Sequence, residues 1–197
     1  MKMNRILIIS VLLFVFIVRA NAQKLDSIVD SRDAKVYKTV KIGEQVWMAQ
    51  NLDFQTEGSC CYHNIAENCE TYGKLYDWEA AKNACPTGWH LPSDLEWQTL
   101  EKFLGMSNTD LDKNNAWRGT DQGKRLVSDS GIGFNLLYGG YRNPPSNYNL
   151  LKMQAFLWTS TEQQGSAWIR QLYEGSTQIF RQTRPVSWSF SVRCVKN

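Results

Sequence analysis

The sequence predicts one α+β domain in which two short helices precede a series of short strands. Two segments, 78–85 and 93–104, carry helix start and stop signals, whereas apolar residues after Gly105 recur only in short runs. The eight tryptophans are scattered from Trp47 to Trp188. This spread favours a core built from many short segments over a bundle of long helices.

The first 22 residues have the features of a secretory signal peptide. Lys2 and Arg5 precede an apolar run over 6–18, and residues 20–22 supply the small side chains that signal peptidase requires. The apolar run is shorter than the roughly 18 residues that a membrane-spanning helix needs. We therefore expect cleavage after Ala22.

Cleavage is expected to leave a loose leader over 23–32 and a single domain over 33–197. Removing residues 1–22 takes away three basic residues and no acidic one, so 19 basic residues face 19 acidic residues. Because the net charge becomes zero, we expect no nucleic-acid partner. The predicted product is exported, to the cell surface or extracellular space or alternatively the periplasm, without membrane insertion of the mature chain.

The first elements of the domain are a hairpin and a short helix. Residues 36–42 alternate apolar with polar side chains, Gly43 marks a turn, and 45–48 resume an extended pattern. Asp77 is a suitable cap for a helix over 78–85, and a proline follows that helix.

The second helix has the more complete signals. Ser93 and Glu96 have the spacing of a capping box, and Gly105 follows the last helical residue. One face of this helix carries Trp97, Leu100, Phe103 and Leu104.

The remainder of the chain is predicted to form short strands around a long irregular loop. Gly139 and Gly140, followed by Asn and Pro residues over 143–147, indicate the loop. The predicted strands are 134–138, 156–160, 167–173, 177–182 and 189–195.

Five cysteines in an exported protein favour two disulfides and one remaining thiol. Spacing makes Cys61–Cys69 a plausible local loop and leaves Cys85–Cys194 as a long-range link. The neighbouring Cys60 could replace Cys61 in the local pair, remain free, or join two chains. Zinc is the competing interpretation, but the two histidines and these cysteine spacings provide no close ligand pairs.

Several blocks of sequence occur together in the order typical of one known family. They are YKTVKIG (37–43), VWMA (46–49), CY (61–62), YGKLYDWEAA (72–81), CPTGWHLPSDLEW (85–97) and FSVRCV (190–195). From about Asp30 onward the chain resembles the Fibrobacter succinogenes major paralogous domain. That family is similar to C-type lectin-like domains, so the resemblance implies a disulfide-linked lectin-like fold with Cys85 paired to Cys194.

Calcium is the one cofactor with a candidate site. Asp110, Asp112 and Asn114 place oxygen ligands at every second residue, and Asp121 lies at the twelfth position. The glycine and the glutamate of a complete calcium loop are missing, and the lectin motifs Glu-Pro-Asn, Gln-Pro-Asp and Trp-Asn-Asp are absent. A solvated loop is the simpler interpretation, and sugar binding through calcium is not expected.

The loop around 138–149 is the candidate ligand surface. Aromatic faces beside amide and guanidinium donors suit a sugar or peptide, because sugar rings stack on apolar faces while their hydroxyls need hydrogen-bond partners. Tyr141 and Tyr148 are the expected contact residues. The full candidate set is Tyr138, Tyr141, Arg142, Asn143, Asn147, Tyr148 and Asn149.

No catalytic motif is recognisable in the sequence. We therefore expect a non-catalytic binding or adhesion module for a glycan or a surface protein. The alternative is a structural protein of an envelope or matrix, with Cys60 linking chains. A third possibility, an enzyme related to formylglycine-generating proteins, requires a reactive cysteine pair, whereas Cys194 is expected to be bonded to Cys85.

Overall fold

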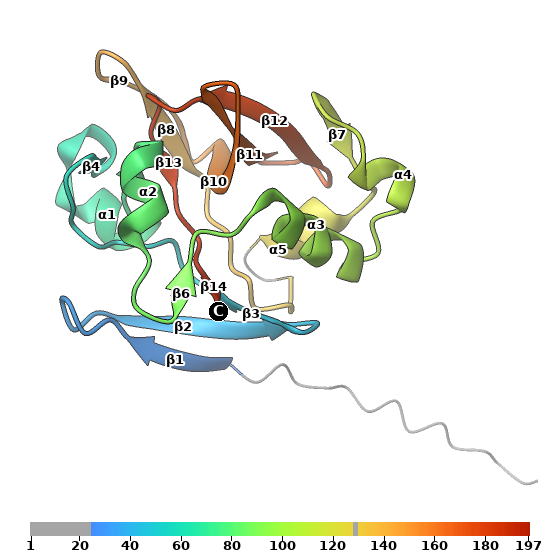
Figure 1. Ribbon diagram of the computed structural model, residues 1–197, viewed down its shortest axis with the longest axis horizontal. Helices are drawn as coiled ribbons and strands as arrows, with labels where there is room; N and C mark the ends of the chain where they lie inside the picture. The colour runs from blue at the N-terminus through green and yellow to red at the C-terminus, as the bar shows by residue number, and fades with distance from the viewer. Residues whose placement is uncertain (1–24, 128–129) are drawn as a thin grey trace, which may run out of the picture.

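The computed structural model describes residues 25–127 and 130–197 and confirms the predicted α+β class, with strands predominating over short helices (Figure 1). The predicted signal peptide over 1–22 lies outside the described residues. The strands are β1 (Leu25–Val29), β2 (Val36–Ile42), β3 (Gln45–Met48), β4 (Ser59–Cys60), β5 (Leu75–Tyr76), β6 (Trp89–His90), β7 (Ala116–Arg118), β8 (Gly139–Asn143), β9 (Asn147–Leu151), β10 (Gln154–Gln163), β11 (Ser166–Tyr173), β12 (Ile179–Pro185), β13 (Phe190–Ser191) and β14 (Val195–Lys196). The helices are η1 (Tyr62–Asn64), α1 (Ala66–Tyr72), α2 (Trp78–Ala84), α3 (Asp94–Phe103), α4 (Asn108–Leu111) and α5 (Gln122–Leu126).

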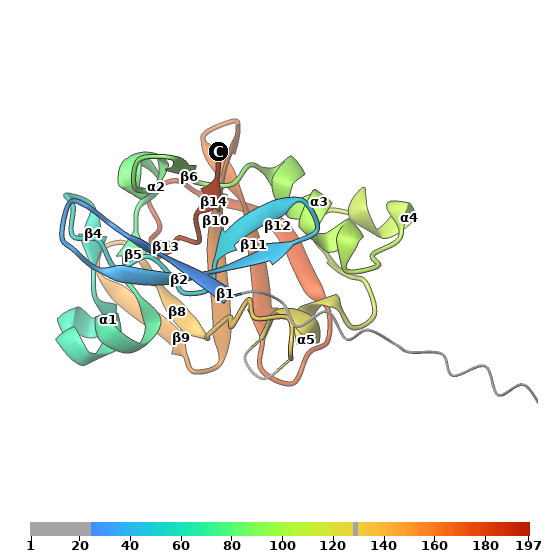
Figure 2. The same cartoon turned by 90° about the horizontal axis from the view of Figure 1, so that it is seen from below.

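Two sheets organise the domain. The smaller has the strand order β1-β2-β3-β14-β6, so β14 lies between β3 and β6, beside the C-terminal end marked in Figures 1 and 2. The larger has the order β4-β5-β13-β10-β11-β12-β7, and the β8–β9 hairpin joins it through β10. The central strands β10 and β11 supply much of the inward-facing side of this sheet.

The core has two parts, each built around tryptophans that sequence reasoning placed in scattered segments. Trp47 and Trp97 lie 5.1 Å apart between their ring centroids, and both pack on Phe134. In the second part, Trp158 packs on Phe190 at 4.4 Å. Its indole N–H donates to the carbonyl of Tyr76 at 2.8 Å, so its polar atom is satisfied inside the core.

Both predicted helices are present with the predicted caps. The Asp77 side chain accepts from the N–H of Ala80, and Ser93 and Glu96 form the full capping box. The hairpin β2–β3 is also confirmed. Phe103 differs from the other apolar residues expected on its helix face, because it is 57% exposed while they are buried.

A buried ionic network fastens α3 to the larger sheet. The Glu101 carboxylate accepts from Arg118 at 2.9 Å and from Arg170 at 2.6 Å, and none of these three side chains is exposed. Asp94 accepts from Arg170 and Arg181, both at 2.7 Å. Burial alone would raise the pKa of Asp94, but these two arginines outweigh it and lower the pKa to about 2.

The cysteine pairing is now resolved. Cys61 pairs with Cys69, and Cys85 pairs with Cys194, as the spacing suggested. Cys60 is the one free cysteine, so two disulfides and one thiol are confirmed. The second disulfide joins the end of α2 to the residue before β14.

Several expectations were wrong in detail. The predicted strand 189–195 is divided into β13 and β14, which lie in different sheets. Within the segment expected to be a loose leader, β1 pairs with β2 over its whole length. Asp30 is buried and bonds Arg32, which donates to the carbonyl of Ala84, so this segment is attached to the end of α2. The stretch 134–138 is not a strand, and of its residues only Leu136 makes a bridge, to Val127.

A further correction concerns the expected long irregular loop, which is a β-hairpin. Strands β8 and β9 pair in antiparallel register, with Arg142 opposite Tyr148 and Asn143 opposite Asn147. The Asn and Pro residues that indicated a loop form only its tip.

Among the described residues, no helix is long and apolar enough to cross a membrane.

Candidate functional site

The β8–β9 hairpin divides the predicted ligand residues between two faces. Side chains alternate along a strand, and directly opposed residues share a face. Arg142 and Tyr148 are opposed and therefore share one face. The other face carries Tyr141, Asn143, Asn147 and Asn149.

Tyr141 packs against the core. Its ring is stacked on Trp188 at a centroid distance of 5.1 Å and an interplanar angle of 7°. Phe156 and Phe190 meet it edge to face at 4.9 and 6.0 Å. We therefore assign Tyr141 to packing, in place of its expected ligand contact.

The asparagines of the hairpin mostly bond one another. The Asn149 side chain donates to the Asn143 side chain at 3.1 Å and to the Asn147 carbonyl at 3.3 Å. These bonds fix the shape of the hairpin near its tip. Tyr138 lies at the hairpin base, where it packs partly buried against the first core cluster, and burial raises its pKa.

Tyr148 belongs to a group of three aromatic rings. Its ring centroid lies 5.2 Å from that of Tyr62 and 4.8 Å from that of His63. Its hydroxyl donates to the Asn64 side-chain oxygen at 3.2 Å. Tyr62 is buried, Tyr148 is half-buried, and His63 and Asn64 are exposed.

The short η1 segment holds these rings in an unusual backbone conformation. His63 and Asn64 have φ values of 54° and 57°, in the left-handed region that residues with a side chain rarely adopt. Two such residues in succession cost about 1–2 kcal/mol each. Backbone strain of this kind is often retained at functional sites.

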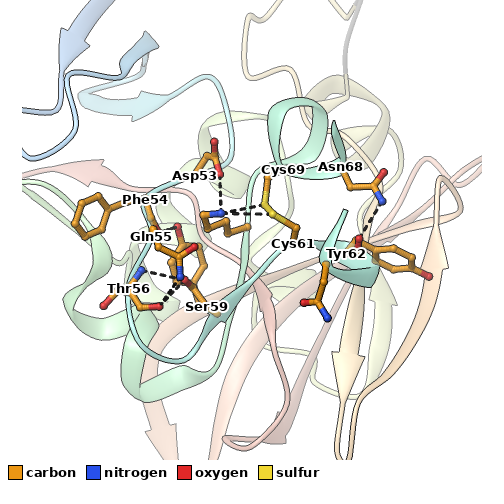
Figure 3. The surroundings of a disulfide bond; sticks show 12 residues. Asp53, Phe54, Gln55, Thr56, Ser59, Cys61, Tyr62, Asn68 and Cys69 are labelled. Atoms are coloured by element: carbon orange, nitrogen blue, oxygen red, sulfur yellow. Dashed lines mark hydrogen bonds and ion pairs between the residues drawn. A yellow bond between two sulfur atoms is a disulfide. The ribbon is translucent and has the colours of Figure 1, made fainter. Parts of the chain in front are cut away.

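The neighbouring disulfide and its contacts keep η1 in place (Figure 3). Cys61 precedes η1 and is bonded to Cys69 of α1. The Asn68 amide donates to the Tyr62 carbonyl at 3.0 Å. The Lys74 ammonium lies 3.2 Å from the Cys69 sulfur and 3.5 Å from the Asp53 carboxylate. The rings are therefore presented on a braced segment.

Cys60 lies beside the Tyr148 hydroxyl. Burial and then the hydrogen bond to the Cys60 side chain raise the pKa of Tyr148 to about 12. The hydroxyl thus stays protonated at neutral pH and acts as a hydrogen-bond donor.

Arg142 completes this surface. Its Nη2 donates to the Ser146 hydroxyl at 3.3 Å, while its buried Nε has no acceptor among the described residues.

We call this surface the Tyr148 face and define it by Cys60, Tyr62, His63, Asn64, Arg142 and Tyr148. Sequence reasoning found Arg142 and Tyr148 but missed Tyr62, His63 and Asn64. The available signal was the position of these three residues directly after Cys61, since a disulfide can hold a short strained segment.

The structure distributes the candidate calcium residues between α4 and the start of α5. Asp110 lies in α4, where its carboxylate binds the Lys113 ammonium at 2.7 Å and the Ser107 hydroxyl at 3.0 Å. Asp121 lies at the start of α5, after β7. No group of three or more His, Cys, Asp or Glu side chains suited to a metal occurs in residues 25–127 and 130–197.

The fold and the site define a class of protein: a disulfide-linked α+β domain with a braced aromatic surface on a hairpin. A sequence model of the Fibrobacter succinogenes major domain matches residues 40–196. The chain belongs to this family, as its sequence blocks indicated. Comparisons with curated proteins and with solved structures find no match.

Proposed function

We propose that this chain is an exported, non-catalytic binding module that presents the Tyr148 face to a glycan. The observation that carries the proposal is the aromatic group of Tyr62, His63 and Tyr148 on strained, braced backbone. A sugar ring stacks on such rings through its apolar face. Asn64, Arg142 and the protonated Tyr148 hydroxyl supply hydrogen-bonding groups beside them.

Two further features support export and a lectin-like architecture as parts of this proposal. Two disulfides suit an oxidising compartment. The Cys85–Cys194 bond is the pairing that the C-type lectin-like resemblance implies, and it supports this part of the proposal. Cys194 is buried in a disulfide, which favours binding over chemistry that requires a reactive cysteine pair.

A glycan array probed with the purified, oxidised chain tests the proposal. Tyr148→Ala should weaken binding to any positive glycan by about thirtyfold or more, the effect of removing a central aromatic contact. Tyr173→Ala is the matched control, because Tyr173 is 44% exposed on β11, outside the Tyr148 face. Equal binding by the Tyr148→Ala variant and the control would refute the assignment.

Assembly through Cys60 is the second candidate function, favoured by the free thiol within the same face. A disulfide between two copies of Cys60 would cover Tyr148, so the two functions compete for one surface. Non-reducing electrophoresis separates them. A dimer that is lost on reduction and in Cys60→Ala favours assembly, whereas a monomer that binds glycan favours the binding module.

A further inference from the structure

A second candidate site lies at the opposite end of α1, around the buried side chain of Arg193. Here a groove of about 350 Å³ opens between the smaller sheet and the residues that end α1. Its lining includes Lys38, Gln50, Thr71, Asn135 and Arg193. The groove and the Tyr148 face share no residue, although Cys69 of the groove lining is bonded to Cys61, the residue before η1.

Arg193 is a buried cation that has no carboxylate partner in the described part of the chain. It is 1% exposed, and its guanidinium donates to the Asn51 side-chain oxygen at 3.1 and 2.7 Å and to the carbonyls of Met48 and Phe134. A guanidinium has five N–H donors, so one hydrogen on Nη2 remains without an acceptor among the described residues. Burial lowers the pKa of Arg193 to about 9.

This arrangement differs from that of the other buried arginines. Arg118 and Arg170 each meet a carboxylate at 2.9 Å or less. Besides its neutral oxygen acceptors, the Arg193 guanidinium lies over the Phe134 ring at 4.6 Å from its centroid. A buried charge without a countercharge keeps much of its desolvation cost. An anionic group in the groove would supply the missing countercharge.

The charged side chains of the lining favour an anion. The lining cations Lys35, Lys38 and Arg193 outnumber the carboxylates of Asp53 and Glu70. Asp53 is already paired with Lys35 at 2.5 Å and with Lys74 at 3.5 Å. Lys38 is exposed and makes no ion pair in the described part of the chain.

Amides provide the hydroxyl-binding groups. Asn135 has a left-handed backbone, with φ of 52°, and no hydrogen bond of its side chain to any described residue is present. The Gln50 side-chain oxygen accepts from the Lys38 N–H at 2.9 Å, which holds that amide beside the groove. The volume is at the lower end of the range for small-molecule sites and suits one or two sugar rings.

We propose that this groove binds the carboxylate of an acidic sugar, with Arg193 and Lys38 as the cations and Asn135 as a hydroxyl partner. The inference stands apart from the proposed function, because none of these residues belongs to the Tyr148 face. The free Nη2 hydrogen of Arg193 would donate to the carboxylate. Lys38 would approach the same group from the rim.

Calorimetric titration of the oxidised chain with trigalacturonate tests the proposal, with its methyl ester as the uncharged match. Lys38→Gln and Asn135→Gly should each weaken trigalacturonate binding by about tenfold, the loss of one hydrogen bond to a charged or buried partner. Glycine tolerates the left-handed backbone, so Asn135→Gly removes the amide without strain. Arg193→Gln should abolish binding, provided that its far-ultraviolet circular dichroism matches the parent chain.

The controls separate this site from the Tyr148 face. Tyr148→Ala should leave trigalacturonate binding unchanged whether or not the glycan proposal for that face holds. Equal affinity for the methyl ester would overturn the carboxylate assignment. Displacement of the sugar by inorganic phosphate at equal concentration would overturn it in favour of a general anion site. Full binding by both Lys38→Gln and Asn135→Gly would overturn the assignment of the sugar to this groove.

Discussion

The two disulfides should contribute unequally to stability, because they close loops of very different length. Cys85 and Cys194 are separated by 109 residues in sequence, whereas Cys61 and Cys69 are separated by 8. Loop-closure entropy in the unfolded chain gives about 4.8 kcal/mol for the long loop and about 2.6 kcal/mol for the short one. The expected difference is therefore about 2 kcal/mol.

Paired alanine variants measure this difference. One variant lacks the Cys85–Cys194 pair and the other lacks the Cys61–Cys69 pair. Each is made in a Cys60→Ala background, which prevents disulfide exchange with the free thiol. Urea unfolding at 25 °C, followed by tryptophan fluorescence, gives the free energy of unfolding of each variant and of the background. Equal losses, or a larger loss for the Cys61–Cys69 pair, would show that loop length does not determine what these disulfides contribute.

Three other predictions concern stability and are checked by the same unfolding measurement. Glu101→Gln should cost about 3–5 kcal/mol, because it leaves buried arginines without their countercharge; a loss below 1 kcal/mol would contradict the network's role. The Asp94 pKa of about 2 lies below the unfolded value, so its stabilisation of about 2 kcal/mol is present above pH 4 and lost as the pH falls toward 2. Asp94→Asn should remove that part of the acid dependence, and an unchanged profile would contradict it. Gly73→Ala should cost at least about 1 kcal/mol more than Gly165→Ala. Both glycines have φ of 74°, but only at Gly73 would a Cβ lie 2.7 Å from a backbone oxygen, that of Leu52. Equal losses would assign the effect to φ alone.

Local sequence signals predicted the helices and the first hairpin well. The capping residues Asp77, Ser93 and Glu96 act within a few residues of the chain, so their pattern is sufficient to define the helix starts. The cysteine spacing likewise gave the long-range link between α2 and β14. Helix caps and cysteine spacing are informative because each leaves only a few possible structures.

The hairpin β8–β9 was not predicted because its stabilising contacts are distant in sequence. Tyr141 is held by Trp188 and Phe190, and Tyr148 by Tyr62 and Asn64. Without these partners, a segment rich in Asn, Gly and Pro has the composition of a loop. The same reasoning explains why Tyr62 and His63 were missed, since only the tertiary structure brings η1 to the hairpin.

The position of β14 in the smaller sheet has a consequence for the order of folding. Residues 190–196 complete both sheets, supply Arg193 and provide the partner of Cys85, yet they are synthesised after the other described elements of this domain. A nascent chain that lacks these residues has no strand between β3 and β6, and Cys85 at the end of α2 has no cysteine with which to form its disulfide. We therefore expect the domain to reach its native fold only after this segment has been synthesised.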